Sequence, residues 1–431
     1  MALGGPDRDS GSERDSHGDR LPPRFTSKLR LWSAFEFRDY RFLWLSSISS
    51  LFTMEMRLLA TSVWLYQETG SGVQLGVLGL IHLIVQFPSI LFGGVLADRL
   101  DRKRLIAFTQ VSSFVLLTML ALLSAADALH PWHIYGVTAV LSVTSILGSP
   151  ARSALTSNVV PRTHLLHAVT SNVATFEIGA VVAPLVFTGL ITTLGITVIF
   201  AVAAAVAVPS VILPLMIRAQ NIASYDGEDG KVLRRVWQGF QFVRSHPILP
   251  GLLIMDLGVN MVSFFRQVLP LIVDRLLRAG PGAVGALTAA NSFGGVAGSL
   301  AVLFLARYRS KGMLVLYATL AYGALLIVFG LSSSMLVAVP VIMALGVTDA
   351  IGMSSRQTIV QLTTPDDVRG RAVSFHEVSA ESANNLGTIY VGFMSQQFGT
   401  RNTLVTGGFI SMIVVVATWV LIRGVRRFRY P

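Results

Sequence analysis

Ionisable and amide side chains occur inside four long apolar stretches of this sequence, where burial is costly unless a partner or a function compensates for it. The ten residues of this kind are Glu55, Arg57, Glu177, Asp256, Asn260, Arg266, Glu377, Glu381, Asn384 and Asn385. Loss of hydration favours the protonated form of a carboxyl group, so the acids are candidates to bind and release protons. The set as a whole could also line a substrate cavity.

Glu377 and Glu381 share one face of a predicted helix. They are four residues apart, and Asn384 and Asn385 continue the same face. Two carboxylates so placed do not both ionise comfortably without a cation, so we expect them to share a proton. Glu377 could instead take part in a contact at the end of its helix.

Other acids have both functional and structural interpretations. Glu177 stands near the middle of its apolar stretch, where it could carry a proton or bond to a polar neighbour. Asp256 and Asn260 are four residues apart and therefore share a face. Asp349 and Arg356 are seven apart on one helix, and we expect them to form a structural pair.

Glu55 and Arg57 lie in the first apolar stretch. They are two residues apart, so they point in different directions and are not expected to pair with each other. We expect Arg266 to lie opposite Glu55, either in the transport site or as a structural ion pair that closes the outer face.

The stretches that carry these residues belong to a chain suited to a lipid bilayer. Of its 431 residues 52% are hydrophobic and only 13% are charged, with a mean hydropathy of +0.63. A soluble protein of this length rarely has such a composition, so we expect an all-α, multi-pass membrane protein. Apolar runs of about 20 residues predict twelve transmembrane helices. Their ranges are 42–66, 73–96, 104–126, 132–154, 165–190, 193–216, 248–273, 281–305, 312–332, 335–358, 370–396 and 402–424.

Polar segments divide the chain into five parts. Residues 1–35 form a polar tail that we expect to be disordered. Two groups of six spans, 36–217 and 248–424, are separated by a linker, 218–247, and followed by a basic tail, 425–431. The end of the linker has apolar residues at helical spacing beside bases. This pattern predicts an amphipathic helix, either on the membrane surface or packed on the bundle.

Basic residues gather on one side of the predicted spans. The net charge is +11, and the loops on the side away from the termini carry only Arg275, Arg278 and Arg401. By the positive-inside rule, both termini are expected in the cytosol and the protein in the cytoplasmic membrane. Orientation therefore accounts for the basic charge, and nucleic acid is not expected as a partner.

Several other kinds of site lack support in the sequence. The chain has no cysteine, which excludes disulfides and cysteine catalysis. Its eight histidines form no zinc-binding motif, and there is no phosphate-binding loop or nucleophile elbow. We therefore expect no metal, no cofactor and no enzymatic activity. No ring of charges favours a channel.

The second half of the sequence repeats landmarks of the first. Residues at the end of the fourth span and in its following loop recur 204 residues later, around the tenth span. The matched pairs are Gly148 with Gly352, Arg152 with Arg356, and Pro161 with Pro365. The repeat predicts two six-helix halves of the same topology.

A charged turn, residues 93–104, separates the second and third spans. Its spaced residues are Gly94, Asp98, Arg99, Arg102, Lys103 and Arg104. This spacing resembles the signature loop of the major facilitator superfamily, although Asp101 stands where that superfamily usually has Gly. The resemblance implies the major facilitator fold, with two six-helix bundles. It also implies a cytosolic conformational latch formed by Gly94, Asp98, Arg99, Arg102, Arg152 and Arg356.

Further segments resemble the enterobactin-exporter-like, multidrug-efflux branch of the superfamily. They are Glu68-Thr69-Gly70-Ser71, Asn158-Val159-Val160-Pro161 and Pro365-Asp366-Asp367-Val368-Arg369-Gly370-Arg371. In the fifth span, Gly179 and Pro184 match the exporter motif of this branch, while Ala183 replaces a Gly.

The resemblance implies a secondary active transporter, a proton-coupled exporter of small amphiphilic molecules of the drug or siderophore type that works by alternating access. We expect it to act as a monomer in the bilayer, with the substrate and protons as its partners. One alternative is a lipid or lysophospholipid flippase. Another is an organic-anion uptake transporter, in which Arg57 and Arg266 would bind the substrate.

Overall fold

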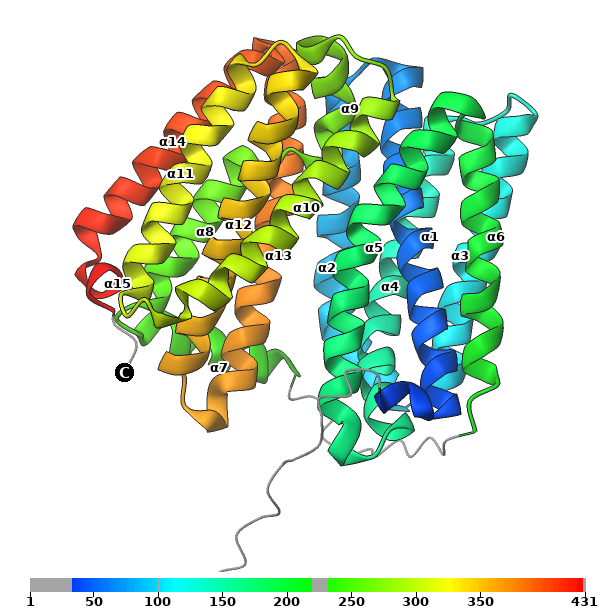
Figure 1. Cartoon of the computed structure of the whole chain (residues 1–431), viewed down its shortest axis with the longest axis horizontal. Helices are drawn as coiled ribbons and strands as arrows, with labels where there is room; N and C mark the ends of the chain where they lie inside the picture. The colour runs from blue at the N-terminus through cyan, green and yellow to red at the C-terminus, as the bar shows by residue number, and fades with distance from the viewer. Residues whose placement is uncertain (1–32, 100, 219–231, 429–431) are drawn as a thin grey trace, which may run out of the picture.

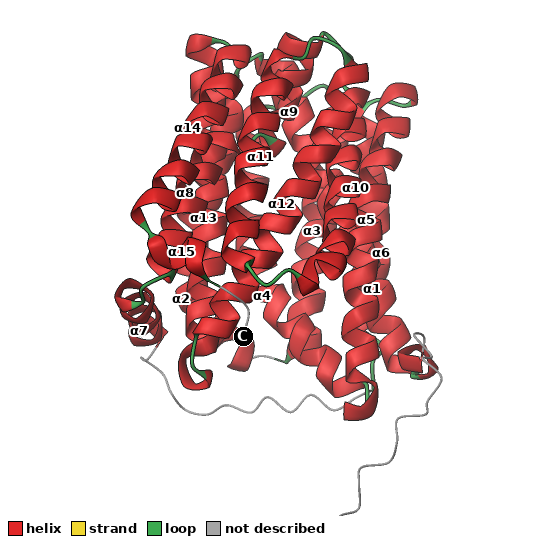
Figure 2. Cartoon of the chain, turned by 60° about the vertical axis from the view of Figure 1, so that its left-hand side comes forward, coloured by secondary structure: helices red, strands yellow, loops and turns green. Residues whose placement is uncertain are grey.

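The computed structural model describes residues 33–99, 101–218 and 232–428, which form helices and short connections with no strand among them (Figure 2). Helices of the first and second halves of the chain gather on opposite sides of the molecule (Figure 1). The first bundle contains α1 (Arg38–Thr69), α2 (Gly72–Arg99), α3 (Arg102–Ala125), α4 (Pro131–Val159), α5 (Leu165–Thr193) and α6 (Ile196–Leu215). The second contains a seventh span that begins with α8 (Leu249–Ser263), then α10 (Gly282–Phe304), α11 (Lys311–Leu331), α12 (Met335–Thr363), α13 (Asp366–Phe398) and α14 (Thr400–Leu421).

The length and composition of these helices suit a membrane. Among the described residues, eight helical segments are long and apolar enough to cross a bilayer by themselves. The helices α1 and α13 are more polar because they carry several of the ionisable residues singled out in the sequence. The predicted all-α membrane fold of twelve spans in two six-helix bundles is confirmed.

The two bundles repeat one another helix by helix. Adding 204 to the residue numbers of α4, 131–159, gives those of α12, 335–363. In the first three spans of each bundle the offset is 209, as for α3 and α11, which begin at 102 and 311. The offset changes because α3 and the connection after it are together five residues longer than α11 and its connection. Two residues related by these offsets are called repeat mates below.

The seventh span is broken rather than continuous. It consists of α8, a 3-10 turn η3 (Arg266–Val268), α9 (Leu269–Ile272) and a π-helical turn η4 (Val273–Leu277). The break begins at Phe264, whose backbone is extended (φ −76°, ψ 103°), and Pro270 starts the next helical turn. The sequence predicted one uninterrupted helix here. The break places Arg266 on a short turn between two rigid segments.

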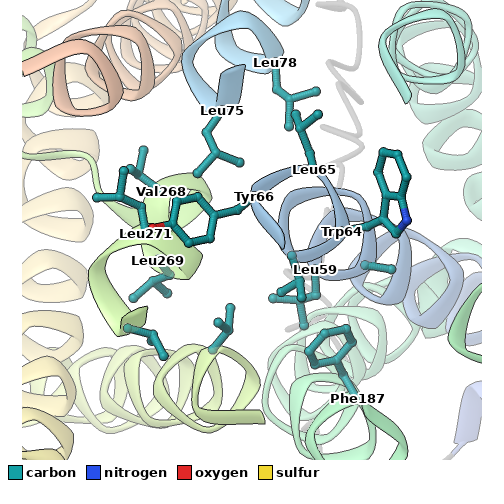
Figure 3. Close-up of a cluster of buried hydrophobic side chains, with 14 of the residues drawn as sticks. Leu59, Trp64, Leu65, Tyr66, Leu75, Leu78, Phe187, Val268, Leu269 and Leu271 are labelled. Carbon is teal, nitrogen blue, oxygen red and sulfur yellow. The ribbon is translucent and has the colours of Figure 1, made fainter. Parts of the chain in front are cut away.

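Among the described residues, the two bundles share an apolar core at one end only. Both ends of the described chain lie at what we call the terminal end of the molecule (Figure 1). At the opposite, distal end, buried apolar side chains of both bundles form one cluster, with Leu65, Leu75 and Phe187 from the first bundle and Leu269 and Leu271 from the second (Figure 3). At the terminal end the described residues form two separate clusters, one in each bundle. The molecule is therefore closed at its distal end.

Polar contacts between the bundles strengthen the distal closure. Tyr66 Oη donates a hydrogen bond to Asp274 Oδ2 (2.7 Å), and Arg275 Nη2 donates to the carbonyl oxygen of Gly70 (3.1 Å). The helices α2 and α13 also approach closely, since a Cβ on Gly72 would stand 2.6 Å from the carbonyl oxygen of Gly392. Larger residues at this contact would push the bundles apart.

The predicted amphipathic helix is α7 (Val232–Ser245), at the terminal end beside the second bundle (Figures 1 and 2). Its Phe240 ring lies 5.8 Å from that of Phe375 on α13, and Val243 is buried, whereas Trp237 is exposed. Of the two interpretations left open, packing on the bundle is the one that these contacts support. Most of the polar tail, 1–32, and part of the linker, 219–231, lie outside the described residues.

Candidate functional site

A cavity of about 400 Å³ lies inside the first bundle, between α1, α3, α4 and α5. We call it the N-bundle pocket. The guanidinium groups of Arg57 and Arg152 line it together with hydroxyl, amide and apolar side chains. No carboxylate occurs among the described lining residues. The lining parts of α3 and α5 lie near the beginnings of these helices, so the pocket extends from the middle of the bundle towards the terminal end.

Arg152 on α4 meets hydroxyl groups in the N-bundle pocket. Its Nη1 donates to Ser47 Oγ (3.0 Å) and to Ser46 Oγ (3.4 Å), both on α1. The resemblance to the superfamily places Arg152 in a cytosolic latch. Among the described side chains it has no ion-pair partner, and the side chain of Asp98 lies outside the described residues. Within the described part of the chain, the positive charge of Arg152 therefore meets only neutral groups in the pocket.

Arg57 is the second cation of the N-bundle pocket and is only 7% exposed. Its Nη1 is buried without a hydrogen-bond partner among the described residues. Glu55, two residues earlier on α1, is also buried, and its charge and that of Arg57 influence each other. The two form no close ion pair among the described contacts, as their spacing predicted. Arg57 thus keeps a donor that is free for a ligand.

A much smaller cavity, the C-bundle pocket, lies between α8, α11 and α12. Here Arg356 Nη2 forms an ion pair with Asp256 Oδ1 at 2.9 Å, and Asn260 Nδ2 donates to the same oxygen (3.1 Å). The expected ion pair of Arg356 with Asp349 is replaced by this one, although Asp349 lines the same pocket. Residues seven apart on one helix are about 10 Å apart along its axis, whereas Asp256 faces Arg356 directly from the neighbouring helix.

The two pockets occupy corresponding places in the two bundles. Every described residue that lines the C-bundle pocket is the repeat mate of a residue that lines the N-bundle pocket. The eight pairs are Ser50 and Val259, Leu51 and Asn260, Gln110 and Thr319, Ser113 and Tyr322, Thr144 and Thr348, Ser145 and Asp349, Gly148 and Gly352, and Arg152 and Arg356. Ser47, which bonds to Arg152, is likewise the mate of Asp256, which bonds to Arg356.

Charges from several helices converge on Arg266, at the break in the seventh span. Its guanidinium acts electrostatically on Glu55 of α1, Asp349 of α12 and Glu381 of α13. The structure thus brings Arg266 towards Glu55, as we expected, and adds two carboxyl groups that the sequence did not connect with it. Arg266 is the repeat mate of Arg57.

The polar face of α13 is divided between the two bundles. Asn384 bonds to Glu381, and Asn385 Nδ2 donates to Gln86 Oε1 of α2 (3.4 Å). Glu377 and Glu381 are both exposed, and the structure records no bond between them. His376, next to Glu377, is buried, and the charges of Asp256 and Arg356 act on it. One end of α13 therefore lies near the ion pair of Asp256 and Arg356, and the other end of its polar face contacts α2.

The helix α5 holds the residues of the fifth-span motif. Gly179 is buried, and a Cβ there would clash with Leu51 of α1. Pro184 is also buried, and its carbonyl oxygen would meet a Cβ on Gly285 of α10 at 2.5 Å. Glu177 lies seven and eleven residues, about two and three helical turns, before Pro184 and Thr188, which approach α10 from the same face of α5. It is half-buried, and it is the repeat mate of Glu381.

Part of the predicted latch lies outside what the structure describes, since the surroundings of Gly94, Asp98 and Arg99 are not among the described features. Arg102 opens α3. A residue that the sequence marked only as unusual has a clear place, since Asp101 caps this helix by accepting hydrogen bonds from the backbone nitrogens of Lys103 (2.9 Å) and Arg104 (3.2 Å). No group of acids and histidines suited to a metal ion occurs among the described residues.

The chain is similar to known membrane transporters along almost its whole length. A family profile described as transmembrane secretion effector matches residues 30–426. The enterobactin exporter EntS of Citrobacter koseri is 26% identical over 401 residues, which is 91% of this chain and 94% of that protein. EntS of Escherichia coli O1:K1 is 25% identical over 398 residues, 90% of this chain and 93% of that protein.

Solved structures of transporters share the fold. The nucleoside transporter NupG has a TM-score of 0.72 at 14% identity and covers 89% of this chain and 99% of its own. A bacterial homolog of the human lysosomal transporter Spinster, solved in an inward-facing and unoccupied conformation, has a TM-score of 0.65 at 15% identity and covers 91% and 99%. At these identities the likeness concerns the fold alone.

Proposed function

The chain belongs to the family of transmembrane secretion effectors, and we propose that it exports small amphiphilic molecules across the cytoplasmic membrane by proton-coupled alternating access. Membership of this family and the similarity to enterobactin exporters support export as the direction. The positive-inside distribution of bases supports placing the terminal end in the cytosol. The acids near the bundle junction supply groups that could carry a proton, and the arginines there interact with their charged forms.

The one-sided closure of the bundles is the observation that carries this proposal. A shared apolar cluster and several hydrogen bonds join the bundles at the distal end, while their described cores are separate at the terminal end. The N-bundle pocket lies on the terminal side of this closure. Such an arrangement suits a state in which a substrate enters from the cytosol. Export then requires the distal contacts to open and the terminal end to close.

Proton coupling is supported by the position of Arg266. It stands three and five residues before Leu269 and Leu271, which belong to the distal cluster, and it interacts with Glu55 and Glu381 from two other helices. Protonation of either carboxyl group removes one attraction for Arg266. Because the turn that carries Arg266 is joined to the distal closure, this change would favour one state of the transporter over the other.

The test is substrate-dependent proton movement in vesicles that contain the purified full-length protein. Lipophilic cations, siderophores and lysolipids are added as candidate substrates, and the internal pH is followed with a fluorescent dye. We expect proton release that depends on a substrate and is lost in Glu381→Gln, Glu177→Gln or both. Glu68→Gln, which removes an exposed carboxyl group near the distal end of α1, should behave like the unchanged protein.

Two results would overturn the proposal. Substrate movement without any proton flux would make these acids structural and would indicate a facilitator or a lipid flippase. Equal loss of proton release in Glu68→Gln and Glu381→Gln would show that the effect does not depend on the charges around Arg266. The comparison of Glu177→Gln with Glu381→Gln also tells which of the two repeat mates carries the proton.

A further inference from the structure

The N-bundle pocket differs in charge from its counterpart in the other bundle. In the C-bundle pocket Asp256 pairs with Arg356, and Asp349 lies beside them. At the mates of these two acids, the N-bundle pocket has Ser47 and Ser145. Both bundles therefore have an arginine at this position, Arg152 or Arg356, but only the C-bundle pocket has carboxylates at the two neighbouring positions. An arginine that faces a cavity without a carboxylate is a binding site for an anion that comes from outside the chain.

A second observation points to a ligand in the same cavity. Arg57 is 7% exposed and lines the pocket, yet its Nη1 has no hydrogen-bond partner among the described residues. A buried charged donor without a partner is costly unless an acceptor arrives to meet it. The charge of Glu55 acts on Arg57, but Glu55 interacts more strongly with Arg266. Glu177 is not among the residues that line the pocket.

We propose that the N-bundle pocket binds the transported amphiphile as an anion: Arg152 meets its anionic head group, a carboxylate, sulfonate or phosphate, and Arg57 meets an acceptor group towards the other end of the molecule. Leu51, Met54 and Phe176 line the same cavity and would hold the apolar body of the molecule. Arg152 contacts α1 at Ser47, ten residues before Arg57, so the two arginines meet the pocket at levels about 15 Å apart along the helix. This separation suits an elongated molecule with an acceptor group near each end.

The inference rests on the proposed function, because it assumes that the bound molecule is a substrate. Its test uses three probes of one shape that differ only in charge: 2-naphthoate, 2-naphthamide and 2-naphthylmethylammonium. Binding to the full-length protein in lipid nanodiscs is measured by titration calorimetry, with empty nanodiscs as the blank. We expect 2-naphthoate to bind at least tenfold more tightly than the other two, as charge-assisted bonds require.

Variants then locate the binding to the pocket. Arg152→Gln should weaken 2-naphthoate binding about tenfold or more, and Arg152→Lys should restore part of it. Ser47→Asp and Ser145→Asp place acids where the C-bundle pocket has them, and each should weaken 2-naphthoate and strengthen 2-naphthylmethylammonium. Arg309→Gln, which removes an exposed arginine outside both pockets, is the matched control and should change neither.

Equal affinity for the three probes, or 2-naphthoate binding that survives both Ser47→Asp and Ser145→Asp, would overturn the proposal. The two serine variants keep it testable if Arg152→Gln does not fold. Vesicle transport separates this result from the proposed function. Proton-coupled movement of neutral or cationic amphiphiles without preference for anions would leave the exporter standing and refute the anion site. Anion binding without transport would leave the anion site standing and refute the proposed export.

Discussion

The N-bundle and C-bundle pockets are built on the same positions of a repeated fold but differ in how their arginines are balanced. Arg356 is held by Asp256 at 2.9 Å, and the cavity around the pair is small. Arg152, its mate, contacts only hydroxyl groups among the described residues and faces about 400 Å³ of space. The larger side chain of Tyr322 stands where the N-bundle pocket has Ser113.

This difference shows how one architecture can provide both a structural and a binding element. A buried arginine with a carboxylate partner has its charge balanced and holds its helices together, since removal of either partner leaves an unpaired charge. The same arginine beside hydroxyl groups is available to a ligand. The side chains at the mates Ser47 and Asp256 therefore decide which role each bundle takes.

The largest effect on stability is expected from breaking the ion pair of Asp256 and Arg356. Asp256→Ala leaves Arg356 buried without its carboxylate and should reduce the stability of the protein by about 3–5 kcal/mol. Ser47→Ala, at the mate position, removes the hydrogen bond from Arg152 to a neutral hydroxyl group beside a larger cavity. It should reduce the stability far less. Thermal unfolding in detergent, followed by tryptophan fluorescence, compares the two.

The double variant Asp256→Leu with Arg356→Met removes both charges and should recover much of the loss. If Asp256→Ala and Ser47→Ala lowered the unfolding temperature equally, the two pockets would not differ in the way their geometry indicates.

Reactivity of introduced cysteines measures the charge of each pocket directly. The chain has no cysteine of its own, so a single substitution gives an unambiguous signal. Ser113→Cys should react faster with an anionic methanethiosulfonate, and Tyr322→Cys, beside Asp349, faster with a cationic one. The ratio of the two rates should differ about tenfold between the sites.

Ser333→Cys, in an exposed connection, supplies the reference ratio for reagents in solution. Equal ratios at Ser113→Cys and Tyr322→Cys would mean that the pockets carry similar potentials, against the distribution of acids in the structure.

The sequence predicted the spans well because the thickness of a bilayer sets their length and apolar composition. It also predicted that Asp256 and Asn260 share a face, since a spacing of four depends on one helix alone. The predicted ion-pair partner of Arg356, Asp349, was wrong. The ion pair of Arg356 joins two helices that are distant in sequence, and the correct acid could be chosen only once their packing was known.

The relation between the two pockets was partly present in the sequence. Glu177 and Glu381 are separated by the same 204 residues as Arg152 and Arg356, so their correspondence could have been read directly. Ser47 and Asp256 are separated by 209 instead, because α3 and the connection after it are together five residues longer than α11 and its connection. A search at a single offset misses them. The break at Phe264 also left no mark on hydropathy, although Pro270 was a signal for it.

The beginnings of α3 and α11 extend the comparison to the loops. Asp101 accepts two backbone hydrogen bonds at the start of α3, whereas its mate Ser310 makes no side-chain cap to α11. Asp101→Ala should therefore cost roughly 0.5–2 kcal/mol, and Asp101→Gly only a few tenths. Ser310→Ala should be nearly neutral. Hydrogen exchange at the first turn of each helix checks this, and faster exchange in α11 than in α3 after the two alanine substitutions would contradict it.

The smallest effect concerns pH at the beginnings of α8 and α1. The ring nitrogen Nδ1 of His246 accepts hydrogen bonds from the backbone nitrogens of Ile248 (3.2 Å) and Leu249 (3.4 Å), whereas its mate Phe37 gives α1 no side-chain cap. Partial burial holds the pKa of His246 below its ordinary value of 6.5. The folded state thus takes up the proton less readily than the unfolded state, so these bonds contribute fully above pH 6.5 and are lost as the pH falls below it.

We therefore expect hydrogen exchange in the first turn of α8 to accelerate between pH 7.5 and pH 5, after correction for the intrinsic rate, while the first turn of α1 stays unchanged. The effect should be at the low end of the roughly 0.5–2 kcal/mol of a helix cap, because His246 is half-exposed. His246→Asn keeps an acceptor but does not titrate, so it should abolish the pH dependence. Acceleration of both helices to the same extent, or its persistence in His246→Asn, would assign the pH response to another group.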